Sequence, residues 1–292
     1  SVMKSLKGLG VALVTPFNED LSVDFSSLTR LVEYNIANGC DFLVVLGTTA
    51  EAATLSKEEK KQVTEHIIKV NNGRLPLVLG IGGNNTAEVK KQIEETDLSA
   101  FEAVLSVSPY YNKPNQEGIY QHYRALAETG KQIIIYNVPG RTGQNVEAST
   151  TLRLAKDFTN LSIIKEAAPN IAQYFDILRK KPAGFSLLSG DDEFTLPVTL
   201  AGGSGVISVI GQAYPKQFSD MLKLAFERRV DDAYAIHNSL VEITRLIFAE
   251  GNPVGIKTVL AEMGLIKNVL RLPLVKASKD LEERIKAEMK NL

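Results

Sequence analysis

Eight short runs of apolar, mostly β-favouring residues are spread along the chain before residue 212. Each run is bounded by Gly, Pro, Asn or Asp, and most begin about thirty residues after the previous one, which is the length of a βα unit. Both faces of these runs are apolar, as is typical of parallel strands that are covered on both sides. The runs predict strands beginning at Gly10, Phe42, Leu75, Ala103, Gln132, Leu161, Phe185 and Gly205.

Amphipathic helical patterns separate the predicted strands. One helical face carries Leu28, Leu31, Val32 and Ile36. The stretch 56–59, SKEE, has the capping-box pattern and begins a helix whose apolar face includes Val63, Ile67 and Ile68. Alternating strands and helices admit a doubly wound open sheet or a closed (β/α)8 barrel. Eight units in about 210 residues favour the α/β TIM barrel.

The pattern becomes purely helical after the eighth predicted strand. No low-complexity segment or Pro/Ser-rich linker separates this part from the rest of the chain. We therefore expect a barrel domain over residues 1–225 and a C-terminal helical domain over residues 226–292 that packs against it.

The composition is that of an ordinary globular protein. Hydrophobic residues make up 44% of the chain, charged residues 23%, and the net charge is -1. Such a balance gives no electrostatic footprint for nucleic acid or an anionic membrane. No apolar stretch approaches the length of about 20 residues that spans a bilayer, and residues 1–10 lack the apolar core of a secretory signal. We expect a cytoplasmic protein.

Cysteine and histidine are scarce. The single cysteine, Cys40, cannot form an internal disulfide. His66, His122 and His237 show no metal-binding spacing, so no metal site is expected.

Polar residues gather where the predicted strands end, which is where a barrel's active site is built. The segments are GTTAE, SPYYN, YNVPGRTG, IIKEA and SGDD. Lys165 closes the sixth run between apolar neighbours, which disfavour a charged ammonium group. A neutral amine can form a Schiff base with a carbonyl substrate, whereas an arbitrary lysine is most often a solvated surface group.

Four other side chains at these ends each have a structural and a chemical interpretation. Tyr136 could cap the barrel core or move protons beside an amine. Thr48 and Thr49 could satisfy local backbone groups or hold a carboxylate. Arg141 could be a solvated loop residue or present a bidentate fork to a substrate carboxylate.

Neighbouring residues in a strand point in opposite directions. If Tyr110 and Tyr111 lie in an extended segment, one can face the site and the other a subunit contact. Glu166 is expected on the side of its strand opposite Lys165, with packing or polar contacts behind the barrel wall.

Six ordered motifs resemble those of the dihydrodipicolinate synthase and N-acetylneuraminate lyase superfamily of pyruvate-dependent class I aldolases. They are GTTAEAATLS, SPYYNKPNQEGIYQHY, YNVPGRTG, IIKEA, LLSGDD and GGSGVISV. The resemblance covers essentially the whole chain and looks closest to the dihydrodipicolinate synthase family. It implies that Lys165 forms a Schiff base with pyruvate, whose enamine attacks L-aspartate 4-semialdehyde to give 4-hydroxy-tetrahydrodipicolinate in lysine and diaminopimelate biosynthesis. No metal or organic cofactor is implied, and the implied assembly is a homotetramer built as a dimer of dimers.

The same resemblance implies roles for individual residues. Tyr136, Thr48 and Tyr111 would form a proton relay, with Tyr111 contributed across a dimer interface. The implied substrate-binding residues are Thr49, Gly190, the backbone of Ile207 and, for the carboxylate of the semialdehyde, Arg141. Sialic-acid lyases usually lack an arginine in the loop that carries Arg141, so this residue favours the synthase.

Two residues depart from the family pattern Gly-Thr-Thr-Gly-Glu-Ser/Thr. Ala50 and Ala52 replace a glycine and a hydroxyl residue. A positive φ at Ala50 would strain the turn, because a Cβ disfavours that conformation.

The resemblance also implies a possible site for L-lysine as an effector. The matching positions are Leu55, Lys60, Asn84, Glu88 and Tyr110. Ala52, Lys57 and Lys60 stand where lysine-sensitive relatives often carry a serine and two histidines. Two ammonium groups would repel a cationic effector unless they pointed to solvent.

Three hypotheses follow. The first is the synthase reaction with pyruvate and L-aspartate 4-semialdehyde. The second keeps the Schiff base but cleaves N-acetylneuraminate or another 2-keto-3-deoxy acid. The third is a non-catalytic barrel that senses a keto acid or lysine, which fold alone does not exclude.

Overall fold

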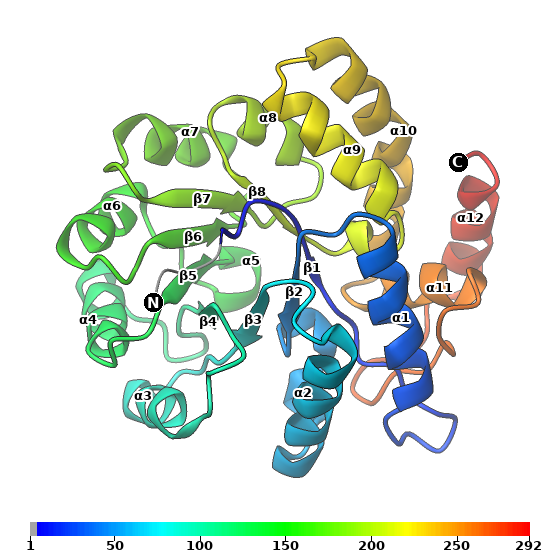
Figure 1. Ribbon diagram of the computed structural model, residues 1–292, viewed down its shortest axis with the longest axis horizontal. Helices are drawn as coiled ribbons and strands as arrows, with labels where there is room; N and C mark the ends of the chain where they lie inside the picture. Colours follow the sequence, from blue (N-terminus) through cyan, green and yellow to red (C-terminus); the bar gives the residue numbers. More distant parts are fainter. Residues whose placement is uncertain (1–4) are drawn as a thin grey trace. The chain divides into compact units, whose positions relative to one another are not determined.

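The computed structural model describes residues 5–292 and contains a closed parallel barrel whose strands follow one another in sequence order (Figure 1). The predicted α/β barrel with C-terminal helices is therefore confirmed. All eight predicted strands are present and begin within two residues of the predicted positions. The strands are β1 (Gly8–Ala12), β2 (Phe42–Val45), β3 (Leu77–Gly80), β4 (Ala103–Val107), β5 (Ile133–Asn137), β6 (Ile163–Glu166), β7 (Ser186–Ser189) and β8 (Gly205–Ser208).

The described chain forms two compact units, of which the first comprises Pro76–Ile207 and the described part of Ser1–Lys7. It holds β3 to β7 and most of β8. Its helices are α3 (Thr86–Glu95), α4 (Gln116–Ala127), α5 (Pro139–Thr142), α6 (Ala148–Asp157), α7 (Ile171–Lys180) and α8 (Thr195–Leu200). Helices α3, α4, α6 and α7 pack side by side in that order, outside the strands of this unit (Figure 1).

The second unit comprises Gly8–Leu75 and Ser208–Leu292. Besides β1 and β2 it contains three short 3-10 helices, η1 (Thr48–Ala50), η2 (Ala52–Thr54) and η3 (Ile210–Gln212). Its α-helices are α1 (Phe25–Ala37), α2 (Lys57–Asn71), α9 (Pro215–Phe226), α10 (Val230–Phe248), α11 (Val254–Glu262) and α12 (Lys279–Met289). Helix α1 packs on α2, and α9 packs on β1 and α10. Helices α10, α11 and α12 contact one another, and a domain boundary at residue 226 stays a prediction.

The helix α2 begins as its sequence predicts. The Ser56 hydroxyl accepts a hydrogen bond from the Glu59 amide at 3.1 Å, and the Glu59 carboxylate accepts one from the Ser56 amide at 2.9 Å. This reciprocal pair is a capping box, which satisfies two amides that helical hydrogen bonding leaves free. The buried face of α2 carries Val63 and Ile67 as expected, while Ile68 is half-buried.

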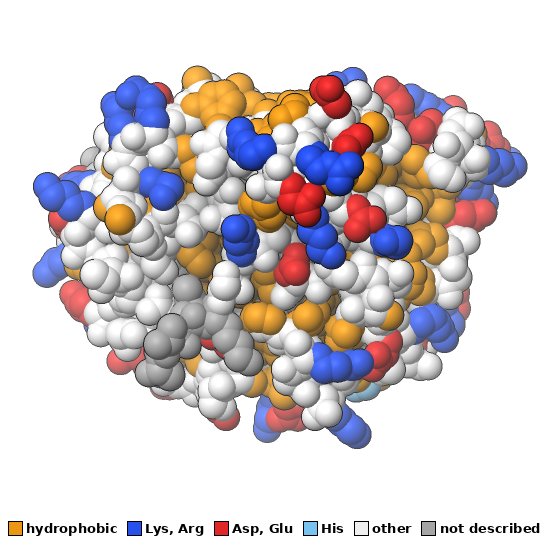
Figure 2. Space-filling model, turned by 45° about the horizontal axis from the view of Figure 1, so that its top comes forward, with side chains coloured by type: hydrophobic (Ala, Val, Ile, Leu, Met, Phe, Trp, Pro, Cys, Tyr) orange, Lys and Arg blue, Asp and Glu red, His pale blue; other side chains and the backbone are white. Residues whose placement is uncertain are grey.

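Charged side chains of both signs are interspersed on the face of the molecule drawn in Figure 2. Such mixing agrees with the net charge of -1. Among the helices of residues 5–292, none combines the length and the hydropathy that a bilayer crossing requires.

Candidate active site

Lys165 and Tyr136 lie side by side on neighbouring strands. The parallel register of β5 and β6 pairs the two residues directly. Both side chains are buried, with 6% of each residue exposed, and the Lys165 Nζ lies 4.0 Å from the centre of the Tyr136 ring. No carboxylate or other hydrogen-bond acceptor contacts this Nζ within residues 5–292. A buried amine without an anionic partner is well placed for nucleophilic chemistry.

Glu166 is fully buried next to Lys165. Its Oε1 accepts hydrogen bonds from the Asn137 amide group at 2.8 Å and from the Ala168 backbone N–H at 3.0 Å. Burial raises the pKa of this carboxyl to about 7, although these hydrogen bonds act in the opposite direction. The expectation of polar contacts for Glu166 is confirmed.

Two further predicted site residues belong to the first unit. Gly190 directly follows β7, and Ile207 lies in β8. The Gly190 N–H donates to the Glu166 carbonyl at 2.7 Å, which extends the pairing of β6 and β7 by one residue. A Cβ at Gly190 would lie 2.8 Å from the Ala167 Cβ and 3.1 Å from Cγ and Cε of Lys165. Glycine here therefore leaves room for the lysine. Ile207 is buried in β8.

Arg141 lies on the short helix α5 and is exposed. Pro139 occupies the first turn of this helix, and Gly143, with φ of 81°, ends it in the left-handed conformation that glycine favours. The segment predicted as a short loop is thus a single helical turn that presents the guanidinium at its surface.

Tyr110 and Tyr111 are not extended, so the prediction of opposite strand-like directions was wrong. Tyr111 has a φ of 70°, which places it in a bend, and it is 91% exposed. The bend is tied to the segment after β3, because the Asn84 amide donates to the Tyr110 carbonyl at 3.1 Å and the Asn112 amide donates to the Asn84 carbonyl at 3.0 Å. The Tyr111 side chain is therefore presented at the surface of its unit.

Thr48 and Thr49 belong to the second unit, in η1 directly after β2. Thr48 is exposed, whereas Thr49 is 2% exposed and its hydroxyl accepts a hydrogen bond from the Asn252 amide at 2.8 Å. Ala50 does not have a positive φ, so the backbone strain that a positive φ would cause there is absent. Glu51 adopts the left-handed conformation instead, with φ of 55°.

A buried ion pair anchors Glu51, and the sequence reasoning missed it. Lys257 of α11 contacts the Glu51 carboxylate at 2.6 Å and donates to the carbonyls of Thr15 at 2.7 Å and Val269 at 2.8 Å. Burial lowers the pKa of Lys257 to about 8, and the attraction of Glu51 opposes that shift. The signal in the sequence was a single charge within the otherwise uncharged, mostly apolar run VGIKTVL.

The residues implied for an effector divide between the two units. In the first, Asn84 contacts Tyr110 as described above, and Glu88 lies exposed in the first turn of α3. In the second, Leu55 is buried and Lys60 is half-buried near the start of α2.

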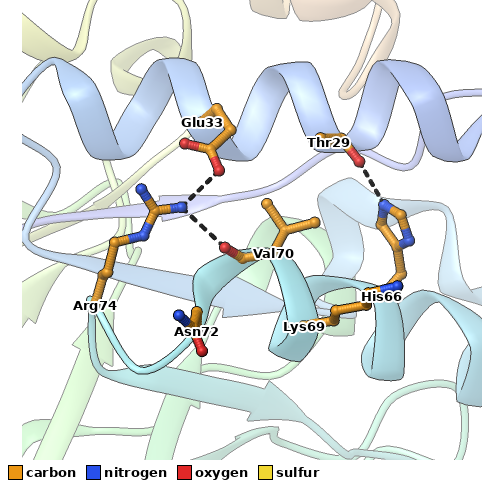
Figure 3. A pocket seen from close by; sticks show the side chains of 7 residues that line it. All are labelled: Thr29, Glu33, His66, Lys69, Val70, Asn72 and Arg74. Atoms are coloured by element: carbon orange, nitrogen blue, oxygen red, sulfur yellow. Dashed lines mark hydrogen bonds and ion pairs between the residues drawn. The ribbon is translucent and has the colours of Figure 1, made fainter.

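A surface hollow of about 580 Å³ lies between α1 and α2 (Figure 3), and none of its lining residues is a predicted site residue. Four of its polar and charged side chains pair with one another. Arg74 pairs with Glu33 at 2.6 Å, and His66 shares a hydrogen bond of 2.7 Å with Thr29. No trio of His, Cys, Asp or Glu side chains in residues 5–292 is placed to hold a metal ion.

The fold and the strand-end residues define a class of protein, namely a (β/α)8 barrel with a buried amine stacked on a tyrosine. Comparison with known proteins defines the family. A family model described as the dihydrodipicolinate synthetase family matches residues 5–292. The chain belongs to this family.

Individual relatives cover nearly the entire chain. A 4-hydroxy-tetrahydrodipicolinate synthase from Flavobacterium psychrophilum is 55% identical over 291 residues, which are 99% of each chain. The crystal structure of the chloride-inhibited dihydrodipicolinate synthase from Acinetobacter baumannii complexed with pyruvate superposes with a TM-score of 0.95 at 38% identity, covering 98% of this chain and 99% of that one. A monomeric dihydrodipicolinate synthase variant gives the same TM-score and identity and covers 98% and 96%.

Proposed function

We propose that this protein is a lyase that condenses pyruvate with L-aspartate 4-semialdehyde to form 4-hydroxy-tetrahydrodipicolinate and water, in lysine and diaminopimelate biosynthesis. The observation that carries the proposal is the Lys165 amine held 4.0 Å from the Tyr136 ring without an anionic partner in residues 5–292. The curated relative at 55% identity is named for the same reaction, and a structural neighbour contains pyruvate.

The chemistry proceeds through a covalent imine. The Lys165 nitrogen attacks C2 of pyruvate, and loss of water gives the Schiff base. Removal of a proton from the pyruvate methyl group gives an enamine, which forms a carbon–carbon bond to the aldehyde carbon of the semialdehyde. The amino group of the second substrate then attacks the imine carbon, and the Lys165 amine leaves, so that the product ring closes and the enzyme is regenerated.

Proton transfer in these steps falls to hydroxyl groups. We assign Tyr136 as the group that exchanges protons with the carbinolamine and the imine, because its ring contacts Lys165. Thr48 and Tyr111 complete the proposed relay. Tyr111 is 91% exposed and held in a bend, which favours its contribution to the site of a second copy of the chain in a homotetramer.

The carboxylates of both substrates need hydrogen-bond donors, and we assign the remaining predicted site residues to this task. Thr49 and the backbone of Ile207 are assigned to pyruvate, with Gly190 providing the space beside Lys165. The exposed Arg141 is assigned to the carboxylate of the semialdehyde, for which a planar guanidinium offers two parallel hydrogen bonds. No metal or organic cofactor enters this scheme.

The proposal places the enzyme in the cytoplasm, with its two substrates and other copies of itself as partners and no role for nucleic acid or membrane. For L-lysine as an effector, the residues at the implied site act in opposite directions. Asn84, Glu88 and Tyr110 offer amide, carboxylate and aromatic groups for an amino acid, whereas Lys60 adds a like charge.

The test is a comparison of acceptors. Purified protein is assayed for pyruvate-dependent consumption of L-aspartate 4-semialdehyde and, separately, for cleavage of N-acetylneuraminate. The proposal predicts turnover of the semialdehyde and inactivation by borohydride only when pyruvate is present. Preferential cleavage of N-acetylneuraminate would support the lyase alternative, and ligand binding without either turnover would indicate a sensor. Arg141→Ala should impair only the synthase reaction severely.

A further inference from the structure

The segment that contains Thr49 is held by residues about 200 positions later in the chain, all within the second unit. Asn252 donates to the Thr49 hydroxyl, and Lys257 pairs with Glu51. The backbone N–H of Arg271 donates to the other Glu51 oxygen at 3.1 Å, and its guanidinium donates to the Thr54 carbonyl at 2.7 Å. The C-terminal part of the chain thus holds the side chains of Thr49 and Glu51 and the backbone carbonyl of Thr54.

The contact with Thr49 differs from the other three because it determines the direction of a proton. A hydroxyl group has one donor hydrogen and two acceptor lone pairs. The Asn252 amide occupies an acceptor position at 2.8 Å, so the O–H bond of Thr49 must point elsewhere. Within residues 5–292 no acceptor takes this hydrogen. The hydroxyl of the buried Thr49 can therefore donate a hydrogen bond to a ligand.

We infer that Asn252 is a positioning residue that turns the Thr49 hydroxyl hydrogen toward the carboxylate of bound pyruvate. The inference rests on the proposed function, because it takes Thr49 as a pyruvate-binding group. Asn252 acts through Thr49 and does not itself touch the reacting atoms.

Two variants of Asn252 test this role. One truncates the side chain, and the other keeps its shape but replaces the amide by a carboxylate. Asn252→Ala deletes the donor and should raise the KM for pyruvate about two- to tenfold, the range expected for one neutral hydrogen bond. Asn252→Asp keeps the shape but offers only acceptors, so it takes the Thr49 hydrogen for itself. It should raise the KM more than alanine does, although a role in packing alone predicts the reverse order. The kcat should change less than the KM in both variants.

Coupling and stability controls separate positioning from general damage. In a Thr49→Ala background, neither Asn252 substitution should raise the KM further, because the hydroxyl that Asn252 orients is gone. Asn71 is the matched control, since its buried amide donates to the Leu75 carbonyl at 2.8 Å in the same unit. Asn71→Ala should lower the Tm and leave the KM for pyruvate unchanged. The Asp variant decides the question if Asn252→Ala does not fold.

The results distinguish this inference from the function on which it rests. A wild-type protein that gives no borohydride-trapped pyruvate adduct overturns both. If wild type forms the adduct but the KM for pyruvate is unchanged in Asn252→Asp, only the role of Asn252 is overturned. The same holds if the Asn252 substitutions raise this KM equally with and without the Thr49 hydroxyl. A KM that rises more for Asp than for Ala, and only when Thr49 is present, supports it.

Discussion

Two buried lysines illustrate how the surroundings of an ammonium group decide its use. Lys257 is 0% exposed, and a carboxylate and two carbonyls surround its Nζ. Lys165 is 6% exposed, and its Nζ faces an aromatic ring without a hydrogen-bond acceptor in residues 5–292. The paired ammonium group of Lys257 connects elements of the structure, whereas the Nζ of Lys165 has no such partner and is available to react.

Loss of Lys165 gives the largest expected effect. Lys165→Met should lower kcat by at least about a thousandfold, because the covalent route is lost. The free energy of unfolding should change by less than about 1 kcal/mol, since no ion pair is broken. Steady-state kinetics and urea unfolding of the same preparation measure the two effects. Substantial residual turnover would remove Lys165 from its proposed role.

Lys257 should behave in the opposite way. Lys257→Met leaves the Glu51 carboxylate buried without its partner, which costs about 3–5 kcal/mol of unfolding free energy. Pyruvate should still form an adduct on Lys165. The matched control is Lys286→Met, whose exposed pairs with Glu282 and Glu262 should leave the free energy of unfolding nearly unchanged. If Glu51→Leu combined with Lys257→Met is no more stable than Lys257→Met alone, the cost does not come from the unpaired carboxylate.

The third prediction concerns pH and the carboxyl next to Lys165. Burial raises the pKa of Glu166 from its ordinary value of 4.5 to about 7, so the folded protein binds this proton more tightly than the unfolded chain. The resulting stability is complete below pH 4.5 and is lost as the pH rises through 7. Glu166→Gln removes this dependence, and wild type should lose about 3 kcal/mol relative to the variant across that window. Urea titrations at a series of pH values measure the unfolding free energy of both proteins. If wild type and Glu166→Gln show the same pH dependence, the raised pKa of Glu166 is contradicted.

The smallest expected effect is at Gly190. Gly190→Ala places a Cβ 2.8 Å from the Ala167 Cβ and 3.1 Å from Cγ and Cε of Lys165, so the lysine side chain must move from its present rotamer. Such a shift costs about 0.5–1.5 kcal/mol, so imine formation should slow by up to about tenfold. Stopped-flow measurement of the pyruvate adduct tests this, with the bulkier Gly190→Val expected to be slower still. Equal rates in all three proteins would mean that Lys165 does not need the space.

The regular part of the fold could be predicted because it depends on local patterns. Apolar runs located all eight strands within two residues, and the capping box at Ser56 appeared as its sequence indicated. The placement of Tyr136 beside Lys165 followed from their positions at the ends of consecutive strands. The period of the apolar positions and the spacing of the runs along the chain are enough to predict such features.

Features that depend on distant contacts or on irregular backbone could not be predicted. Thr49 and Asn252 are 203 positions apart, and no local pattern links them. The bend at Tyr111 requires a positive φ, which an aromatic residue does not signal in advance. The sequence raised a positive φ at Ala50 only as a condition for strain, and the positive φ lies one residue later, at Glu51.

The most direct test of the contrast between the two lysines is peptide mapping by mass spectrometry after borohydride reduction in the presence of pyruvate. The account predicts one reduced pyruvyl adduct, on the peptide that contains Lys165, and none on the peptide that contains Lys257. An adduct on Lys257, or none on Lys165, would contradict it.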